Sequence, residues 1–167
     1  AKGPHPLPMR AILDHKVKIV LGTDNMTEDM FHAMKMGLTL HRGAYQRSVI
    51  PTPQQVFNYA TVNAARALDH SGIGSIAVGM KADLAMFDLM TPALSPRVSA
   101  ISNIVHYGHP GTVTDTMVDG RFLMRDRVLT TIDERAAVQE AQAATDAMWH
   151  RFGSEDRGVP LPSSDRY

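Results

Sequence analysis

Apolar and polar residues alternate with a helical period in the first part of the chain. Residues 8–15 predict a short helix because their apolar side chains fall on one face, and the β-branched residues at 17–21 predict a strand. Gly22 marks the end of that strand. From Thr27 to about Arg42 the apolar residues return to helical spacing. We therefore expect a helix, a strand and a longer helix in this order.

Two later helix starts carry the pattern of a capping box. At residues 52–55, Thr is placed to cap, Pro to occupy the first helical position and Gln to bond back from the third. The apolar stripe that follows predicts a helix to about Leu68. Residues 131–134 repeat the motif with Thr and Glu, and an Ala-rich helix is expected from there to about Phe152.

Between these two helices the period changes to two. Residues 75–78 and 82–88 predict one β-hairpin, and residues 113–118 and 121–124 predict another. Residues 101–107 fit a further strand. The sequence thus predicts a small all-β unit between helical segments.

The composition is that of an ordinary globular domain. Of the 167 residues, 44% are apolar and 20% are charged, so the chain can bury a core. Lys plus Arg and Asp plus Glu each total 17, so there is no bulk positive field to attract nucleic acid or anionic lipid. We expect small-molecule or protein partners, and neither nucleic acid nor a membrane.

Cysteine is absent from the sequence, which excludes disulfides, thiolate metal sites and cysteine nucleophiles. Any metal must therefore use His, Asp or Glu as ligands. No apolar stretch approaches the roughly 18 residues of a membrane span, and the first residues contain no apolar signal-peptide region. These features predict a soluble, cytoplasmic protein.

Asp24 is the residue with the strongest chemical argument. It follows the predicted strand at 17–21 and precedes the predicted helix, whose first turn would hold Glu28 and Asp29. Carboxylates at the carboxyl ends of parallel strands lie where α/β folds assemble active sites, and there they ligate a metal or accept a proton. An Asp at such a turn also commonly caps a helix or bonds loop backbone, so both interpretations stay open.

The histidines form no ligand pattern, because neither His-x-His nor His-Glu-x-x-His occurs. His106 and His109 are three residues apart, but Gly108 and Pro110 place them at a strand end. A surface or core role is therefore favoured over metal binding for both.

Methionines recur at helical spacing after Asp24, at Met26, Met30, Met34 and Met36. Such a stripe usually fills a core, and its alternative is an adaptable lining that faces a substrate. The core-filling interpretation is favoured.

The order of four motifs resembles the carboxy-terminal third of the amidohydrolase superfamily. The motifs are Val17 to Asn25, Thr52-Pro53 with the helix at 60–68, residues 73–84 ending in Gly-Met-Lys-Ala-Asp-Leu, and Val118-Asp119-Gly120-Arg121. The resemblance covers about residues 4–152, and the last two motifs are highly specific in this order. The chain looks most like the branch that contains cytosine and guanine deaminases, S-adenosylhomocysteine deaminase and the triazine hydrolases.

The resemblance implies an α/β fold, namely a C-terminal fragment of a (β/α)8 TIM barrel with part of an accessory β-sandwich and a C-terminal helix. Residues 1–70 would end the barrel domain with its last strand and following helices, and residues 71–130 would belong to the composite β-sandwich and carry no chemistry. Residues 131–153 would be the C-terminal helix, and residues 154–167 a flexible tail.

The resemblance also implies a metal-dependent hydrolase in which hydroxide activated by zinc or iron attacks a ring or amide carbon. On this match Asp24 is the metal-site carboxylate and shuttles a proton, and Asn25 is a candidate substrate contact. The substrate would be a small nitrogen heterocycle whose C–N bond is cleaved by deamination or a related hydrolysis.

The family's metal-binding histidines and its catalytic Glu all lie upstream of the first motif found here. One Asp cannot hold a metal that needs about three protein ligands, so we expect zinc or iron in the full-length enzyme and an inactive, metal-free chain on its own. A truncated gene, a proteolytic product and a partial sequence are alternative explanations. The alternative function is a non-catalytic oligomerisation or interaction domain, and a homo-oligomer is expected because it would bury the orphan strand.

Overall fold

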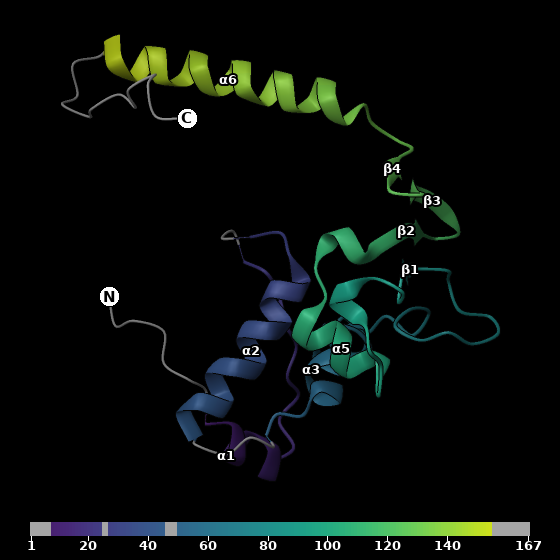
Figure 1. Cartoon of the computed structure of the whole chain (residues 1–167). Helices are drawn as coiled ribbons and strands as arrows, with labels where there is room; N and C mark the ends of the chain where they lie inside the picture. Colours follow the sequence, from purple (N-terminus) through teal and green to yellow (C-terminus); the bar gives the residue numbers. More distant parts are fainter. Residues whose placement is uncertain (1–7, 25–26, 46–49, 155–167) are drawn as a thin grey trace. The chain divides into compact units, whose positions relative to one another are not determined.

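The computed structural model describes residues 8–24, 27–45 and 50–154, and Figure 1 shows its helices and strands. Contacts divide the chain into two units, residues 1–128 and residues 129–167. Within the described residues, no helix is both long and apolar enough to cross a membrane. The domain boundaries expected from the sequence stay predictions.

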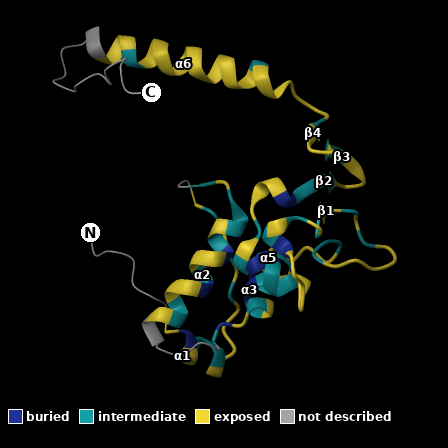
Figure 2. Ribbon diagram, viewed as in Figure 1, coloured by how far each residue is buried: buried dark blue, intermediate teal, exposed yellow. Residues whose placement is uncertain are grey.

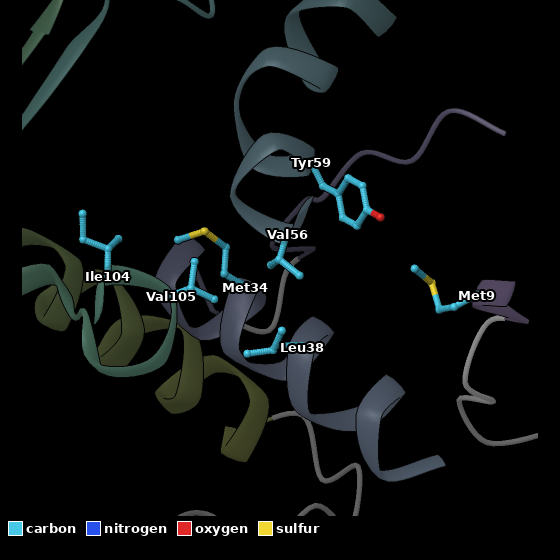
Figure 3. Packing of buried hydrophobic residues seen from close by; sticks show 7 residues of the cluster. All are labelled: Met9, Met34, Leu38, Val56, Tyr59, Ile104 and Val105. Carbon is cyan, nitrogen blue, oxygen red and sulfur yellow. The ribbon is translucent and has the colours of Figure 1, made fainter. Parts of the chain in front are cut away.

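The first unit combines a group of helices with a small sheet. Its helices are α1 (Met9–Asp14), α2 (Met30–Tyr45), α3 (Pro53–Ala60), α4 (Val62–Ala67) and α5 (Ala100–Tyr107), with 3₁₀ turns η1 (Pro92–Leu94) and η2 (Pro110–Thr112). Helices α2, α3 and α5 pack on one another, and Figure 2 shows buried residues gathered there. The core cluster, seen close up in Figure 3, consists of Met9, Met34, Leu38, Val56, Tyr59, Ile104 and Val105. The short helix expected at 8–15 is confirmed as α1.

Helix α2 begins at Met30 and not at Thr27, where its apolar pattern starts. Asp29 precedes the helix and accepts a hydrogen bond from the Phe31 N–H at 2.8 Å. This carboxylate therefore caps the helix, and neither Glu28 nor Asp29 lies in its first turn. The long helix itself is confirmed.

The capping box expected at 52–55 is confirmed. Thr52 Oγ1 accepts a hydrogen bond from the Gln55 N–H at 3.2 Å, and the Gln55 side chain accepts one from the Thr52 N–H at 2.8 Å. A single helix to Leu68 is wrong, however. Thr61 has φ −127° and ψ −96°, which separates α3 from α4.

Replacing Thr52 by Ala should lower the free energy of unfolding by about 1 kcal/mol, because the Gln55 N–H loses its acceptor. Urea unfolding measures this loss. Thr39→Ala, on the exposed side of α2, is the matched control and should leave the free energy within about 0.5 kcal/mol. Equal values for the two variants would contradict the capping role.

The sheet contains β1 (Leu84–Phe87), β2 (Val113–Val118), β3 (Arg121–Arg125) and β4 (Val128–Leu129), in the order β1-β2-β3-β4. β1 pairs with β2 and β2 with β3, both antiparallel. The hairpin expected from 113–118 into 121–124 is confirmed. Its turn residues Asp119 and Gly120 have φ 49° and 79°, as a type I′ turn requires.

The other expected hairpin, from 75–78 into 82–88, is wrong. Residues 75–78 form no strand, and β1 pairs with β2 instead, with Leu84 opposite Met117. Ile76 is left 89% exposed. An alternating pattern shows that a segment suits a sheet, but it does not identify the strand that completes the ladder.

The strand expected at 101–107 is also wrong, because this segment is helix α5. The Ser99 side chain caps the helix by accepting a hydrogen bond from the Ser102 N–H at 3.3 Å. The buried residues of this helix, Ile104 and Val105, both belong to the core cluster. A short apolar run is compatible with the period of a helix and with that of a strand, and here the Ser99 cap favours the helix.

The second unit is built on α6 (Glu134–Ser154), which confirms the expected Ala-rich helix. Its cap differs from the expected Thr131, since Asp133 Oδ1 accepts a hydrogen bond from the Ala136 N–H at 3.0 Å. The tail expected at 154–167 lies, from residue 155 onward, outside the described residues.

Candidate functional site

Asp24 follows residues 17–23, which contain no assigned helix or strand. The strand expected at 17–21 is therefore wrong as a hydrogen-bonded element. A strand needs a ladder with a neighbour, and no segment among the described residues supplies one. Asp24 is exposed and has φ 57°, a left-handed conformation that Asp adopts more readily than most residues.

Hydrogen bonds from the α3–α4 region hold this segment instead of a ladder. The Leu21 N–H donates to the Tyr59 carbonyl at 3.0 Å, and Asn63 Nδ2 donates to the Ile19 carbonyl at 3.2 Å. The side chains of Ile19 and Leu21 pack against the core cluster, whereas Val20 is 48% exposed. One face of the segment is thus fixed to the helices.

A small cavity of about 70 Å³ lies between the segment and the helices. Its lining includes Met9, Ile19, Leu21, His41 and Tyr59. The Tyr59 hydroxyl is buried with no hydrogen-bond partner among the described residues, and burial raises the pKa of Tyr59. Figure 3 shows this hydroxyl pointing away from the side of the cluster where Ile104 lies. Ligand pockets usually exceed about 300 Å³, so this cavity is too small for a heterocyclic substrate.

The described residues do not form a complete metal centre. They include no group of three or more His, Cys, Asp or Glu side chains that could hold one ion. A hydrolytic metal site needs about three protein ligands and a water. Asp24 offers one carboxylate, so the described residues do not by themselves fit a bound zinc or iron.

The two histidines noted in the sequence make structural contacts. In the last turn of α5, His106 Nδ1 lies 2.8 Å from the Ser102 carbonyl, to which it donates a hydrogen bond. The His109 carbonyl accepts a hydrogen bond from Thr112 Oγ1 at 2.6 Å where η2 begins. Their expected place at a strand end is wrong, because the preceding segment is a helix.

The residues that follow Asp24 are only partly described. Asn25 and Met26 lie outside the described residues, so Asn25 as a substrate contact stays a prediction. Met34 is buried at 4% exposure and Met30 packs against the core cluster. These two methionines fit the core-filling interpretation, whereas Met36 is 41% exposed.

Comparison with known proteins identifies the family. The model of the amidohydrolase family matches residues 2–123. The chain belongs to the amidohydrolase family. It is 34% identical over 151 residues to a 5′-deoxyadenosine deaminase of Methanosarcina mazei, a match that covers 88% of this chain and 35% of the relative. It is 32% identical over 155 residues to an S-triazine hydrolase of Gordonia rubripertincta, which covers 87% of this chain and 32% of the relative.

The structure of the amidohydrolase chain also resembles a solved one. A crystal structure of an adenosine deaminase from Xanthomonas campestris with bound zinc matches with a TM-score of 0.76 and 26% sequence identity, over 82% of this chain and 32% of that one. The chain therefore spans about a third of the length of these relatives. The superfamily resemblance drawn from the order of the sequence motifs is confirmed.

Sequence reasoning did not single out Tyr59 and Asn63, through which the helices of this amidohydrolase hold residues 17–23. Asn63 gave a weak signal, because Asn is disfavoured in helix interiors and its side chain tends to bond backbone groups. Tyr59 gave none, since its carbonyl and not its side chain makes the contact.

Other ionisable groups of the amidohydrolase chain have structural partners. Asp115 accepts hydrogen bonds from Thr114 Oγ1 at 2.6 Å and from the Asp126 N–H at 3.2 Å. The Thr114 hydroxyl is the main reason that the pKa of Asp115 lies below its usual value. Lys81 and Asp119 form an exposed ion pair at 3.2 Å. These contacts connect strands and turns of the sheet.

Proposed function

We propose that this chain is part of an enzyme that hydrolyses a C–N bond of a small nitrogen heterocycle. The observation that carries the proposal is an exposed carboxylate, Asp24, directly after residues 17–23 in a chain that matches the amidohydrolase family. Relatives named as a 5′-deoxyadenosine deaminase and an S-triazine hydrolase support a nitrogen heterocycle as the substrate. Deamination is the reaction that the first of these names favours.

In this proposal Asp24 faces the attacking water and acts as a general base. Its carboxylate accepts a proton from the water and returns it to the departing amine, so that the amine leaves as a neutral molecule. The exposure of Asp24 supports this role, because a proton acceptor must be reachable by substrate and water. Asn25, the next residue, would contact the ring.

Zinc or iron would supply the Lewis acidity that makes water nucleophilic at neutral pH. The bound zinc of the adenosine deaminase from Xanthomonas campestris supports zinc. Asp24 would provide one ligand, and the remaining ligands would come from outside the described residues. We propose that residues 17–21, which have no ladder partner among the described residues, form the last strand of a TIM barrel when the rest of the enzyme supplies a neighbouring strand. We also propose that the sheet belongs to an accessory β-sandwich and that the 167-residue chain is inactive alone.

The test is ammonia release by the intact protein, meaning the full-length enzyme of which this chain is proposed to be a part, purified with zinc. Adenosine derivatives and amino-substituted triazines are supplied in turn, and ammonia is measured with a coupled enzymatic assay. We expect turnover of at least one substrate, its loss after dialysis against a chelator, and its return when zinc is added back. No ammonia or amine from any of these rings, with metal bound at one equivalent, would contradict the proposal.

A non-catalytic interaction domain remains the rival interpretation, and a homo-oligomer stays a prediction. Ile76 and Val78 are apolar side chains with 89% and 108% exposure, which a different partner or a second copy of the chain could cover. Among the described residues, none of the contacts favours this rival over catalysis.

A further inference from the structure

The break between α3 and α4 leaves a backbone carbonyl for the segment that leads to Asp24. In an uninterrupted helix the Tyr59 carbonyl would accept the N–H four residues later, that of Asn63. Thr61 interrupts this pattern with its non-helical angles, and its own hydroxyl donates to the Phe57 carbonyl at 2.8 Å. The Tyr59 carbonyl instead accepts the Leu21 N–H at 3.0 Å.

Asn63 provides a second contact from the first turn of α4. Its Nδ2 donates to the Ile19 carbonyl at 3.2 Å, across 44 positions of sequence. The acceptor is a carbonyl, so the amide nitrogen must face it. Ile19 and Leu21 pack on the core cluster while Val20 between them is 48% exposed, the alternation in which residues two apart present their backbone groups to the same side. The two bonds therefore hold the segment as a pair of ladder bonds would.

We propose that Asn63 is a positioning residue, which together with the Tyr59 carbonyl forms a clamp on residues 19–21 and so fixes the place of Asp24. The inference rests on the proposed role of Asp24. Asp24 lies only three residues beyond Leu21, whose N–H the clamp holds, and is itself in a left-handed conformation with φ 57°. A displacement of about 1 Å at a reacting group can cost about 100-fold in rate, so a clamp at this distance affects catalysis.

The packing around the clamp supports a positioning role. Ile19 and Leu21 are partly buried against the core cluster, and a Cβ built on Gly37 of α2 would lie 3.4 Å from Leu21 Cδ1. Both side chains also line the cavity of about 70 Å³, so packing leaves them some room and the two hydrogen bonds are needed to hold the backbone in place. On the other face Val20 is 48% exposed, so among the described residues the helices alone restrain the segment.

The test replaces Asn63 by Asp and by Leu in the intact zinc-loaded protein. Asp has the same shape but cannot donate, and Leu removes the polar group without adding charge. Asn58→Asp is the matched control, because the Asn58 side-chain oxygen accepts a hydrogen bond from Gln54 at 2.9 Å on α3, and Asp keeps that acceptor. Hydrogen exchange of the peptide that contains Leu21 is followed by mass spectrometry, and kcat and KM are measured for ammonia release.

Both Asn63 variants should raise the exchange rate of the Leu21 amide about tenfold and lower kcat about 10- to 100-fold, with KM within about twofold. The control should change neither. Unchanged exchange in whichever Asn63 variants fold would overturn the clamp, and raised exchange with unchanged kcat would overturn the positioning role. If the intact protein shows no turnover at all, the proposed function fails, while the exchange measurement still decides whether the clamp exists.

Discussion

Replacing Asp24 by Asn in the intact enzyme is expected to lower kcat for ammonia release by about 100- to 10,000-fold. Asn has nearly the same shape and also adopts the left-handed conformation that Asp24 has at φ 57°. The substitution therefore keeps the backbone turn, removes the ability to accept a proton and replaces the proposed anionic metal ligand by a neutral amide, so the zinc content of the variant is measured beside kcat. The loss appears in kcat, because proton transfer belongs to the transition state and not to substrate binding.

Asp69→Asn is the matched control for this experiment. Asp69 is also exposed and left-handed, with φ 52°, but it follows α4 and not residues 17–23. The control should keep kcat within about twofold, and both variants should keep the stability of the parent protein. Full activity of the Asp24 variant would contradict the role of Asp24 as the general base. An equal loss of kcat in both variants would mean that the effect does not depend on the position of Asp24 after residues 17–23.

Elements with local signals were predictable from the sequence. The capping box at Thr52 satisfies donors within three residues of itself, so its pattern alone places the start of α3. The hairpin turn at Asp119 and Gly120 is also local, because its positive φ angles depend on those two residues. Both predictions are confirmed, as is the Ala-rich helix α6.

Elements that depend on a distant partner were not predictable. Residues 75–78 have the alternation of a strand, yet the ladder bonds of β1 are made with β2, about 30 residues away. Residues 17–21 have β-branched side chains, but among the described residues no strand lies beside them. Both segments have a strand-like sequence, but a strand forms only where a second strand supplies the ladder hydrogen bonds.

The candidate site divides in the same way. Asp24 was identified from a local argument, since it comes after a β-branched run and before a helix. The contacts that hold it were not, because they join Asn63 to Ile19 and the Tyr59 backbone to Leu21 across about 40 residues. The break at Thr61 that makes the second contact possible carries no Gly or Pro signal.

The core cluster against which Ile19 and Leu21 pack includes Leu38 of α2, and replacing Leu38 by Ala should lower the free energy of unfolding by about 2–5 kcal/mol. Leu38 is 2% exposed and belongs to the same core cluster as Met34, Val56 and Val105. Ala removes three buried carbon atoms and leaves a space that close-packed neighbours fill only in part. The measurement is urea unfolding of the intact protein, with a lower midpoint and an unchanged slope.

Leu40→Ala is the control, because Leu40 lies on the same helix and is 51% exposed. It should change the free energy of unfolding by no more than about 0.5 kcal/mol. A loss below 1 kcal/mol for Leu38→Ala would mean that α2 does not pack on α3 and α5 as described. In the folded state Leu38→Ala should reduce kcat less than Asn63→Leu does, since Leu38 supports the core cluster and Asn63 bonds the backbone that leads to Asp24. On this proposal stability depends on Leu38 and catalysis on Asn63, so the two variants separate support of the fold from placement of the carboxylate.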